Sequence, residues 1–324
     1  QEHPARRLSS RTSPTNIGMT MLANLSAYDF GYCAANQLVE RTENTFDTLD
    51  GMERYQGHFF NWYDTRSLEP LSPKYVSTVD SGNLAGHLMV LRRGLLELID
   101  TRIVPARLID GVKDTASVLM EVIGAQIKDS DPGCDLALVK GVLQQVERLD
   151  AELSTHAAPG NLNAWMPFLD RLITMTSDIV AVKGPHGEFQ TWTRCLNENL
   201  VAHRDDIVHL APWALLPSPP EELLRANTDE ANPALETLRA WLKNEENILT
   251  LREEAGLKQT LIPAIDGVLA DRRQKNSAGD NINDWLTQLR SAISEGALRA
   301  LERIRALEML AERCHETANM DFLF

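Results

Sequence analysis

Cysteine is scarce in this sequence of 324 residues, which contains only Cys33, Cys134, Cys195 and Cys314. The four are far apart and form no CxxC pair, so the usual zinc-ligand spacing is missing and a disulfide framework is disfavoured. Each stands in or beside a helix-like pattern, where a reduced cysteine is usually a small core residue. We therefore expect no metal site and a reducing, cytoplasmic compartment.

Positive charge is also in short supply, because 32 Lys and Arg residues stand against 46 Asp and Glu residues, for a net charge of −14. Such a field repels polyanions, which excludes nucleic acid and an anionic membrane surface as partners. The sequence has no uncharged apolar stretch near the roughly 20 residues that a membrane-spanning helix needs, and no signal peptide is visible. We expect any membrane span of the parent protein to lie outside this segment.

The sequence motifs of several enzyme classes are missing. It has no P-loop, no GxGxxG and no GxSxG nucleophile elbow. His203 and His209 are six residues apart, and no HExxH pattern occurs. These patterns give no candidate catalytic residue, and we expect no cofactor.

What is present is the composition of a folded chain. An apolar share of 43% and a charged share of 24% are ordinary for globular proteins. The sequence starts at Gln1 instead of Met and stops at Phe324, inside an apolar run. We interpret both ends as cuts within a longer polypeptide.

The spacing of apolar residues predicts an all-α fold. In residues 1–100, helical patterns over residues 17–25, 31–49 and 84–98 predict three helices, the last capped by Ser81 or Asn83. Between the second and third, residues 55–79 combine glycine, proline and alternating aromatics, which favours an ordered loop or a short hairpin. We treat residues 1–100 as the first domain.

Residues 101–324 are predicted to form the second domain, an antiparallel helical bundle. Each helical stretch has one apolar face, and the connections are short, so neighbouring helices should pack antiparallel. The acidic run that includes Glu245, Glu246, Glu253 and Glu254 is interpreted as a solvated helix face. The expected breaks between helices are Asp131-Pro132-Gly133, Pro159-Gly160, Gly184-Pro185 and residues 217–220.

Three polar strings in the first domain are candidate functional segments. Residues 11–16 precede a helix, and their spacing alone favours a capping role. Residues 58–65 combine aromatic rings with amide and carboxylate groups, which suits a neutral sugar and equally well an aromatic anchor for a loop. Residues 75–87 place Asp80, Ser81 and Asn83 near a helix start, where a cap with a satisfied buried His87 is the commoner outcome.

The same strings resemble cyclic β-1,2-glucan synthases. Residues 11–18 (RTSPTNIG), 61–65 (NWYDT) and 75–88 (YVSTVDSGNLAGHL) look like segments that this family carries in the same order. The closing Met320-Asp321-Phe322-Leu323 resembles the lead-in to the family's glucoamylase-like section. The likeness is good over residues 10–90, whereas residues 101–318 resemble only a helical connection of loose sequence.

The resemblance implies a fold and a parent protein. The family's parent is a very large enzyme of the inner membrane that joins a nucleotide-sugar glucosyltransferase, a ring-closing transglycosylase and a phosphorylase-like domain. Its transglycosylase resembles a retaining (α/α)6 barrel, so residues 1–100 would form partial (α/α)6-barrel-type hairpins ahead of the helical bundle. The chain would then lie at the cytoplasmic face of the bacterial inner membrane, with other domains of the same polypeptide as partners.

The resemblance also implies how the chain takes part in catalysis. The family's catalytic glutamates lie downstream of Phe324, so the segment should be inactive alone and should contribute a substrate groove for a β-1,2-glucan chain. An uncovered apolar face could make the isolated segment a homodimer. The residues expected to bind substrate are Arg11, Asn61, Trp62, Tyr63, Asp64, Asp80, Ser81 and Asn83, with the two aromatic rings as stacking surfaces.

Two hypotheses from different classes therefore stand. In the first, the segment forms part of the substrate groove of a glucan transglycosylase. In the second, it is a non-catalytic helical linker or docking module between the transferase and phosphorylase-like domains, and the strings supply only caps and core. The first requires the polar strings to converge on one surface, which a structure can examine.

Overall fold

A computed structural model of the chain describes residues 9–128, 136–155, 157–181, 187–225, 232–244, 248–274 and 281–321. These residues form eleven α-helices and four strands of two residues each, so the predicted all-α fold is confirmed. The expected breaks at Asp131-Pro132-Gly133 and Gly184-Pro185 lie outside the described residues, as do Cys134, Glu245, Glu246 and residues 322–323.

The chain divides into two compact units. Unit 1 consists of the described parts of Gln1–Asp29, Ala35–Ile99 and Arg305–Phe324, and unit 2 of Phe30–Ala34 and the described parts of Asp100–Ile304. The division passes between Asp29 and Phe30, between Ala34 and Ala35 and between Ile99 and Asp100, and the expected division into residues 1–100 and 101–324 stays a prediction. The return of residues 305–321 to unit 1 was not foreseen.

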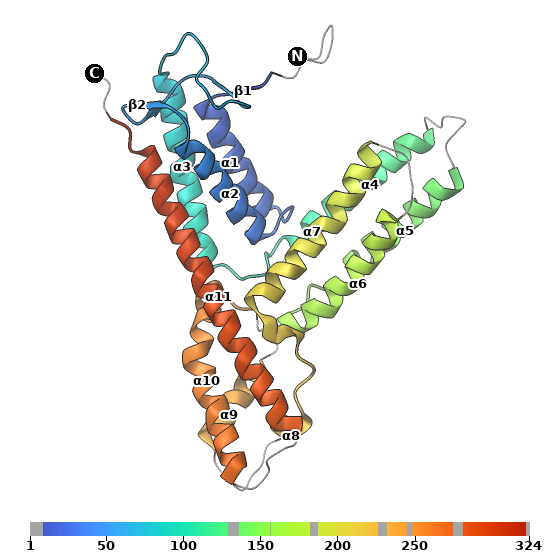
Figure 1. The fold of residues 1–324 in the computed structure, drawn as a ribbon. Coiled ribbons are helices and arrows are strands. Elements are labelled where there is room, and N and C mark those ends of the chain that lie inside the picture. Colours follow the sequence, from blue (N-terminus) through green and yellow to red (C-terminus); the bar gives the residue numbers. More distant parts are fainter. Residues whose placement is uncertain are drawn as a thin grey trace. The chain divides into compact units, whose positions relative to one another are not determined.

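Unit 1 is built around three helices, α1 (Pro14–Asp29), α2 (Ala35–Asp50) and α3 (Thr78–Glu97), in which α1 packs on both α2 and α3 (Figure 1). A Cβ at Gly18 would lie 2.5 Å from His87 Nδ1. Glycine at this position therefore permits a close approach of the α1 backbone to α3 that a larger residue would prevent. The apolar core of the unit includes Met21, Leu25, Phe46, Leu84, Leu88, Leu91 and Leu95.

The start of α3 differs from the expectation. Ser77, in an extended conformation, caps the helix by accepting a hydrogen bond from the backbone N–H of Asp80, so the prediction of Ser81 or Asn83 as the cap was wrong. The sequence Ser77-Thr78-Val79-Asp80 places an acidic residue three positions after the cap, which is the usual signature of a helix start. Ser81 and Asn83 are instead inside the first two turns of the helix.

Four short strands complete the top of unit 1. Strand β1 (Arg11–Thr12) pairs antiparallel with β4 (Tyr63–Asp64), so that Arg11 lies opposite Asp64. Strands β2 (Arg54–Tyr55) and β3 (His58–Phe59) form the short hairpin that the loop composition favoured. The loop of residues 51–77 is therefore held by backbone pairing on both of its sides.

The last turns of α11 (Asn281–Ala318) also belong to unit 1. Arg313 donates hydrogen bonds to the carboxylates of Asp47 and Asp50, and its guanidinium lies 5.0 Å from the centroid of the Phe46 ring. These contacts fix residues 305–318 against α2, more than 250 residues away in the sequence. No local sequence pattern predicts a contact of this kind.

Unit 2 contains a bundle of α4 (Leu108–Lys128), α5 (Leu136–Thr155), α6 (Leu162–Val180) and α7 (Glu188–Leu210), in which each helix packs on the next and α7 returns to α4 (Figure 1). A second group follows. It consists of η2 (Pro212–Leu215), α8 (Glu221–Leu224), α9 (Pro233–Leu242), α10 (Leu251–Gln274) and the first part of α11.

One residue of α10 corrects the sequence interpretation. Glu254 was expected on a solvated face, but its side chain is 0% exposed and accepts hydrogen bonds from Trp213 Nε1 at 2.9 and 3.2 Å. The expectation failed because one turn of α10 faces the core while the neighbouring Glu253 faces solvent. Among the described residues, no helix is both long and apolar enough to cross a membrane.

Candidate functional site

The β1–β4 pairing brings the first two polar strings together. The guanidinium of Arg11 lies 4.5 Å from the centroid of the Trp62 ring, a cation–π geometry, and Arg11 faces Asp64 across the strand pair. Arg11 is exposed, whereas Trp62 and Asp64 are half-buried. A charged, planar and aromatic surface therefore forms from residues that are about fifty positions apart.

Asp64 is already committed to its own turn. Its carboxylate accepts hydrogen bonds from the side chain of Arg66 at 3.2 Å and from the backbone N–H groups of Arg66 and Ser67. The hydrogen bond from the Arg66 side chain, followed by that from the Arg66 backbone, lowers the pKa of Asp64. A carboxylate held ionised in this way orders residues 64–67 and does not resemble a proton donor.

A second contact joins the first and third strings. The hydroxyl of Thr15 donates to Asp80 Oδ1 at 2.6 Å and accepts from Asn83 Nδ2 at 3.1 Å. This triad connects the first turn of α1 with the first two turns of α3, and Asn83 is exposed. Thr15 was not among the predicted site residues, although it lies in the first polar string. Because Thr15 is four residues from Arg11, the Cα atoms of these two residues lie within about 14 Å of each other.

Two of the predicted site residues lie inside the protein. Tyr63 is 0% exposed, and its hydroxyl donates to the carbonyl of Glu53 and accepts from the N–H of Phe60. The structure therefore does not support Tyr63 as a stacking surface. Asn61 is also buried and donates to the hydroxyl of Tyr75 at 2.6 Å. Both residues anchor the loop to the core.

Ser81 is buried as well and forms part of a relay of hydrogen bonds. Its hydroxyl lies 2.8 Å from His58 Nδ1, and His58 Nε2 lies 2.7 Å from the carbonyl oxygen of Asp321. Because a carbonyl oxygen only accepts, the ring proton belongs on Nε2, and Nδ1 then accepts from Ser81. These two hydrogen bonds attach residue 321 to the loop of residues 51–77. Ser81 therefore has a structural role and does not face a ligand.

A hollow of about 410 Å³ adjoins the paired strands in unit 1. Its lining combines hydroxyl groups and one amide with apolar side chains, a mixture that suits a sugar. No three His, Cys, Asp or Glu side chains of the described part of the chain gather in a way that could hold a metal ion. The residues that line the hollow are Thr12, Ile17, Thr20, Asn44, Thr45, Thr48, Leu49, Met52, Thr65 and Leu68.

Comparison with known proteins gives one informative match. The chain is 45% identical over 124 residues to the cyclic beta-(1,2)-glucan synthase NdvB of Rhizobium meliloti (strain 1021). This match confirms the resemblance to cyclic β-1,2-glucan synthases that the polar strings indicated. The matched stretch is 38% of this chain but only 4% of the length of that relative, and no protein-family model matches the sequence.

Proposed function

We propose that this chain is part of a glucan synthase and that the exposed groups of unit 1 contact a β-1,2-glucan chain without carrying out chemistry. In this proposal the segment contributes to glucan binding and to cyclisation by transglycosylation within a larger, membrane-anchored polypeptide at the cytoplasmic face. The identity to NdvB supports a role in glucan synthesis. The observation that carries the groove is that two contacts join separate strings: Arg11 lies over the ring of Trp62, and Thr15 bonds to Asp80 and Asn83.

The chemistry of these exposed and half-buried groups suits a neutral sugar. The C–H faces of a pyranose pack on an aromatic surface, and Trp62 offers a half-exposed ring that Arg11 holds in place. The sugar's hydroxyls both donate and accept, and the amide of Asn83 and the carboxylate of Asp80 match these two needs. The proposed contact set is therefore smaller than the one expected from the sequence, because Asn61, Tyr63 and Ser81 are buried.

The direct test is calorimetric titration of the chain with β-1,2-glucooligosaccharides. We expect Trp62→Ala to weaken binding by about 1–3 kcal/mol, the scale of one lost aromatic anchor, and Asn83→Ala by about 1 kcal/mol. Trp192→Ala and Gln288→Ala, which change another half-buried indole and an exposed amide in unit 2, serve as matched controls and should leave affinity unchanged. Equal affinity of the wild type and Trp62→Ala for the oligosaccharides would refute the proposed groove.

A second candidate function is a helical docking module, and one observation favours it. Asn61, Tyr63, Asp64 and Ser81 all have their polar groups satisfied within the protein, as caps and anchors require. In this case neither the wild type nor Trp62→Ala would release heat on titration with the oligosaccharides. The module would instead bind another domain of the same polypeptide, which co-purification of the separately expressed domains would detect.

A further inference from the structure

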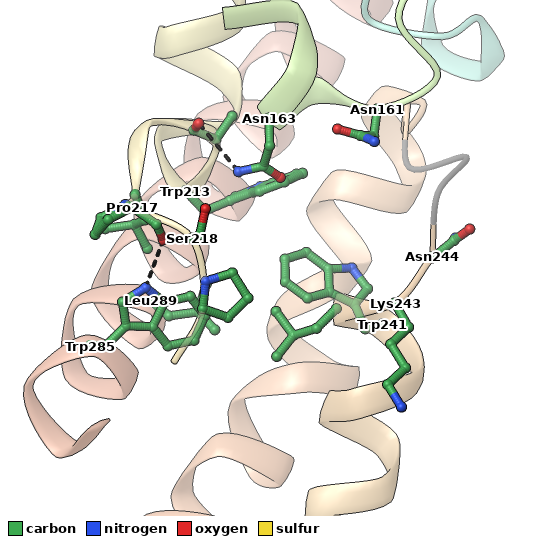
Figure 2. A pocket seen from close by; sticks show the side chains of 14 residues that line it. Asn161, Asn163, Trp213, Pro217, Ser218, Trp241, Lys243, Asn244, Trp285 and Leu289 are labelled. Carbon is green, nitrogen blue, oxygen red and sulfur yellow. Dashed lines mark hydrogen bonds between the residues drawn. The ribbon is translucent and has the colours of Figure 1, made fainter. Parts of the chain in front are cut away.

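A separate pocket lies in unit 2, far in sequence from the polar strings. It encloses about 290 Å³ between η2, the end of α9 and the first turns of α11, and the start of α6 borders it. Figure 2 shows Trp285 with Pro217 on one side and Trp241 on the other, with Trp213 next to them. Three of the six tryptophans of the chain thus line one small cavity.

Two of these indoles are rigidly held, and the third is partly open. Trp213 donates to Glu254, and Trp285 donates to the carbonyl of Pro217 at 2.9 Å. Trp241 packs edge-on against Trp213, with the ring centroids 5.0 Å apart, and it alone of the three is half-exposed. The cavity therefore presents one accessible aromatic ring on a fixed aromatic base.

The polar groups at the rim are neutral. Asn163 donates to the carbonyl of Ala214 and keeps its amide oxygen for another partner, and the hydroxyl of Ser218 is exposed beside it. The one cation among the lining residues is Lys243, whose side chain points away from the rings in Figure 2. The nearby Glu254 is buried behind Trp213, and burial raises its pKa to about 8, so it is uncharged at neutral pH.

These features select one class of ligand. A cationic ligand finds no carboxylate among the lining residues, and an anionic one finds only Lys243, whose side chain points away from the rings. A purely apolar ligand makes no use of the amide oxygen of Asn163 or the hydroxyl of Ser218. A neutral ring with apolar faces and hydroxyl edges satisfies both parts of the site. The volume lies at the small end of the range for ligand pockets, which suits a single ring.

We propose that this tryptophan pocket binds one glucosyl unit of a β-1,2-glucan chain, as a second contact separate from the groove of unit 1. The choice of glucan as the source of the ring rests on the proposed function, whereas the preference for a neutral sugar rests on the pocket itself. The pocket gives unit 2 a direct part in holding the polymer. No such role follows from the packing of its helices.

The experiment uses the Trp62→Ala chain as background, so that the groove contributes little to the signal. Tryptophan fluorescence is followed during titration with β-1,2-glucooligosaccharides, and we expect a saturable change. Adding Trp241→Leu should weaken the apparent affinity about fivefold or more, whereas Trp241→Phe, which keeps a ring, should restore most of it. Trp192→Phe, which removes an indole elsewhere in unit 2, should change the signal amplitude and not the affinity.

Two surface variants keep the test independent of the packing of Trp241. Asn163→Leu and Ser218→Val change exposed polar groups at the rim, and each should weaken binding about threefold or more. The proposal is overturned if the Trp62→Ala chain shows no saturable change, or if Trp241→Leu and both rim variants leave the affinity unaltered. The proposed groove fails on a different result, which is an unchanged affinity when Trp62→Ala alone is compared with the wild type.

Discussion

Replacing Glu254 by glutamine should change how the stability of unit 2 depends on pH. Burial raises the pKa of this carboxyl group from 4.5 to about 8, while its hydrogen bonds from Trp213 act in the opposite direction. Between these two pH values the folded chain keeps a proton that the unfolded chain releases. Stability therefore falls as pH rises through this window, by about 1.4 kcal/mol per pH unit and by about 5 kcal/mol in total.

A buried histidine acts in the opposite direction over part of the same range. Burial lowers the pKa of His203 from 6.5 to about 4, so the unfolded chain binds a proton that the folded chain does not. This group contributes stability that grows with pH from about 4 to 6.5. The slopes from Glu254 and His203 nearly cancel up to pH 6.5, and above it the wild type should lose about 2 kcal/mol by pH 8.

The comparison of the wild type with Glu254→Gln isolates the carboxyl group, because His203 is common to both. Glutamine keeps an oxygen that accepts from Trp213 Nε1 and cannot ionise. Urea unfolding followed by tryptophan fluorescence at pH 5, 6, 7 and 8 gives the two free energies of unfolding. We expect near equality at pH 5 and an advantage for the variant that grows to several kcal/mol at pH 8. A difference that stays constant with pH would refute the reasoning.

Two further outcomes are expected. A Cβ at Gly111 would lie 2.4 Å from the carbonyl oxygen of Gly31, so Gly111→Ala should lower the free energy of unfolding by about 1–3 kcal/mol, whereas Gly124→Ala on the same helix enters open space and should raise it by about 0.5–1 kcal/mol. Urea unfolding of the two variants checks both signs. The purified chain should neither hydrolyse nor transfer β-1,2-glucans, which product analysis by chromatography checks; turnover that disappears on mutation of Asp64 or Asp80 would contradict this.

The helices were largely predictable because their information is local. The apolar spacing of residues 84–98 located most of α3. Helix boundaries were harder to predict where several possible cap residues stand close together. Ser77, Ser81 and Asn83 are all good caps, and the structure uses the one with Asp80 three residues later.

The contacts that assemble the candidate site were not predictable from the sequence pattern. Strand β1 pairs with β4 across fifty residues, and His58 bonds to Asp321 across more than two hundred and fifty. Such pairs depend on tertiary packing, and no periodicity encodes them. The tryptophan pocket was missed for the same reason, because Trp213, Trp241 and Trp285 stand in separate helical stretches and each is a typical core residue when taken alone.

The string of residues 61–64 shows why likeness to a glucan synthase does not by itself define a binding surface. Burial alternates along it, with Asn61 and Tyr63 inside and Trp62 and Asp64 towards the surface, as the two-residue period of an extended chain requires. The inward residues hold the loop, since their polar groups bond to Tyr75, Glu53 and Phe60. A variant such as Tyr63→Phe would therefore lower affinity only by loosening the frame. Of the two outward residues, Asp64 is bonded within its own turn, so replacement of Trp62 is the change that distinguishes a sugar contact from a structural anchor.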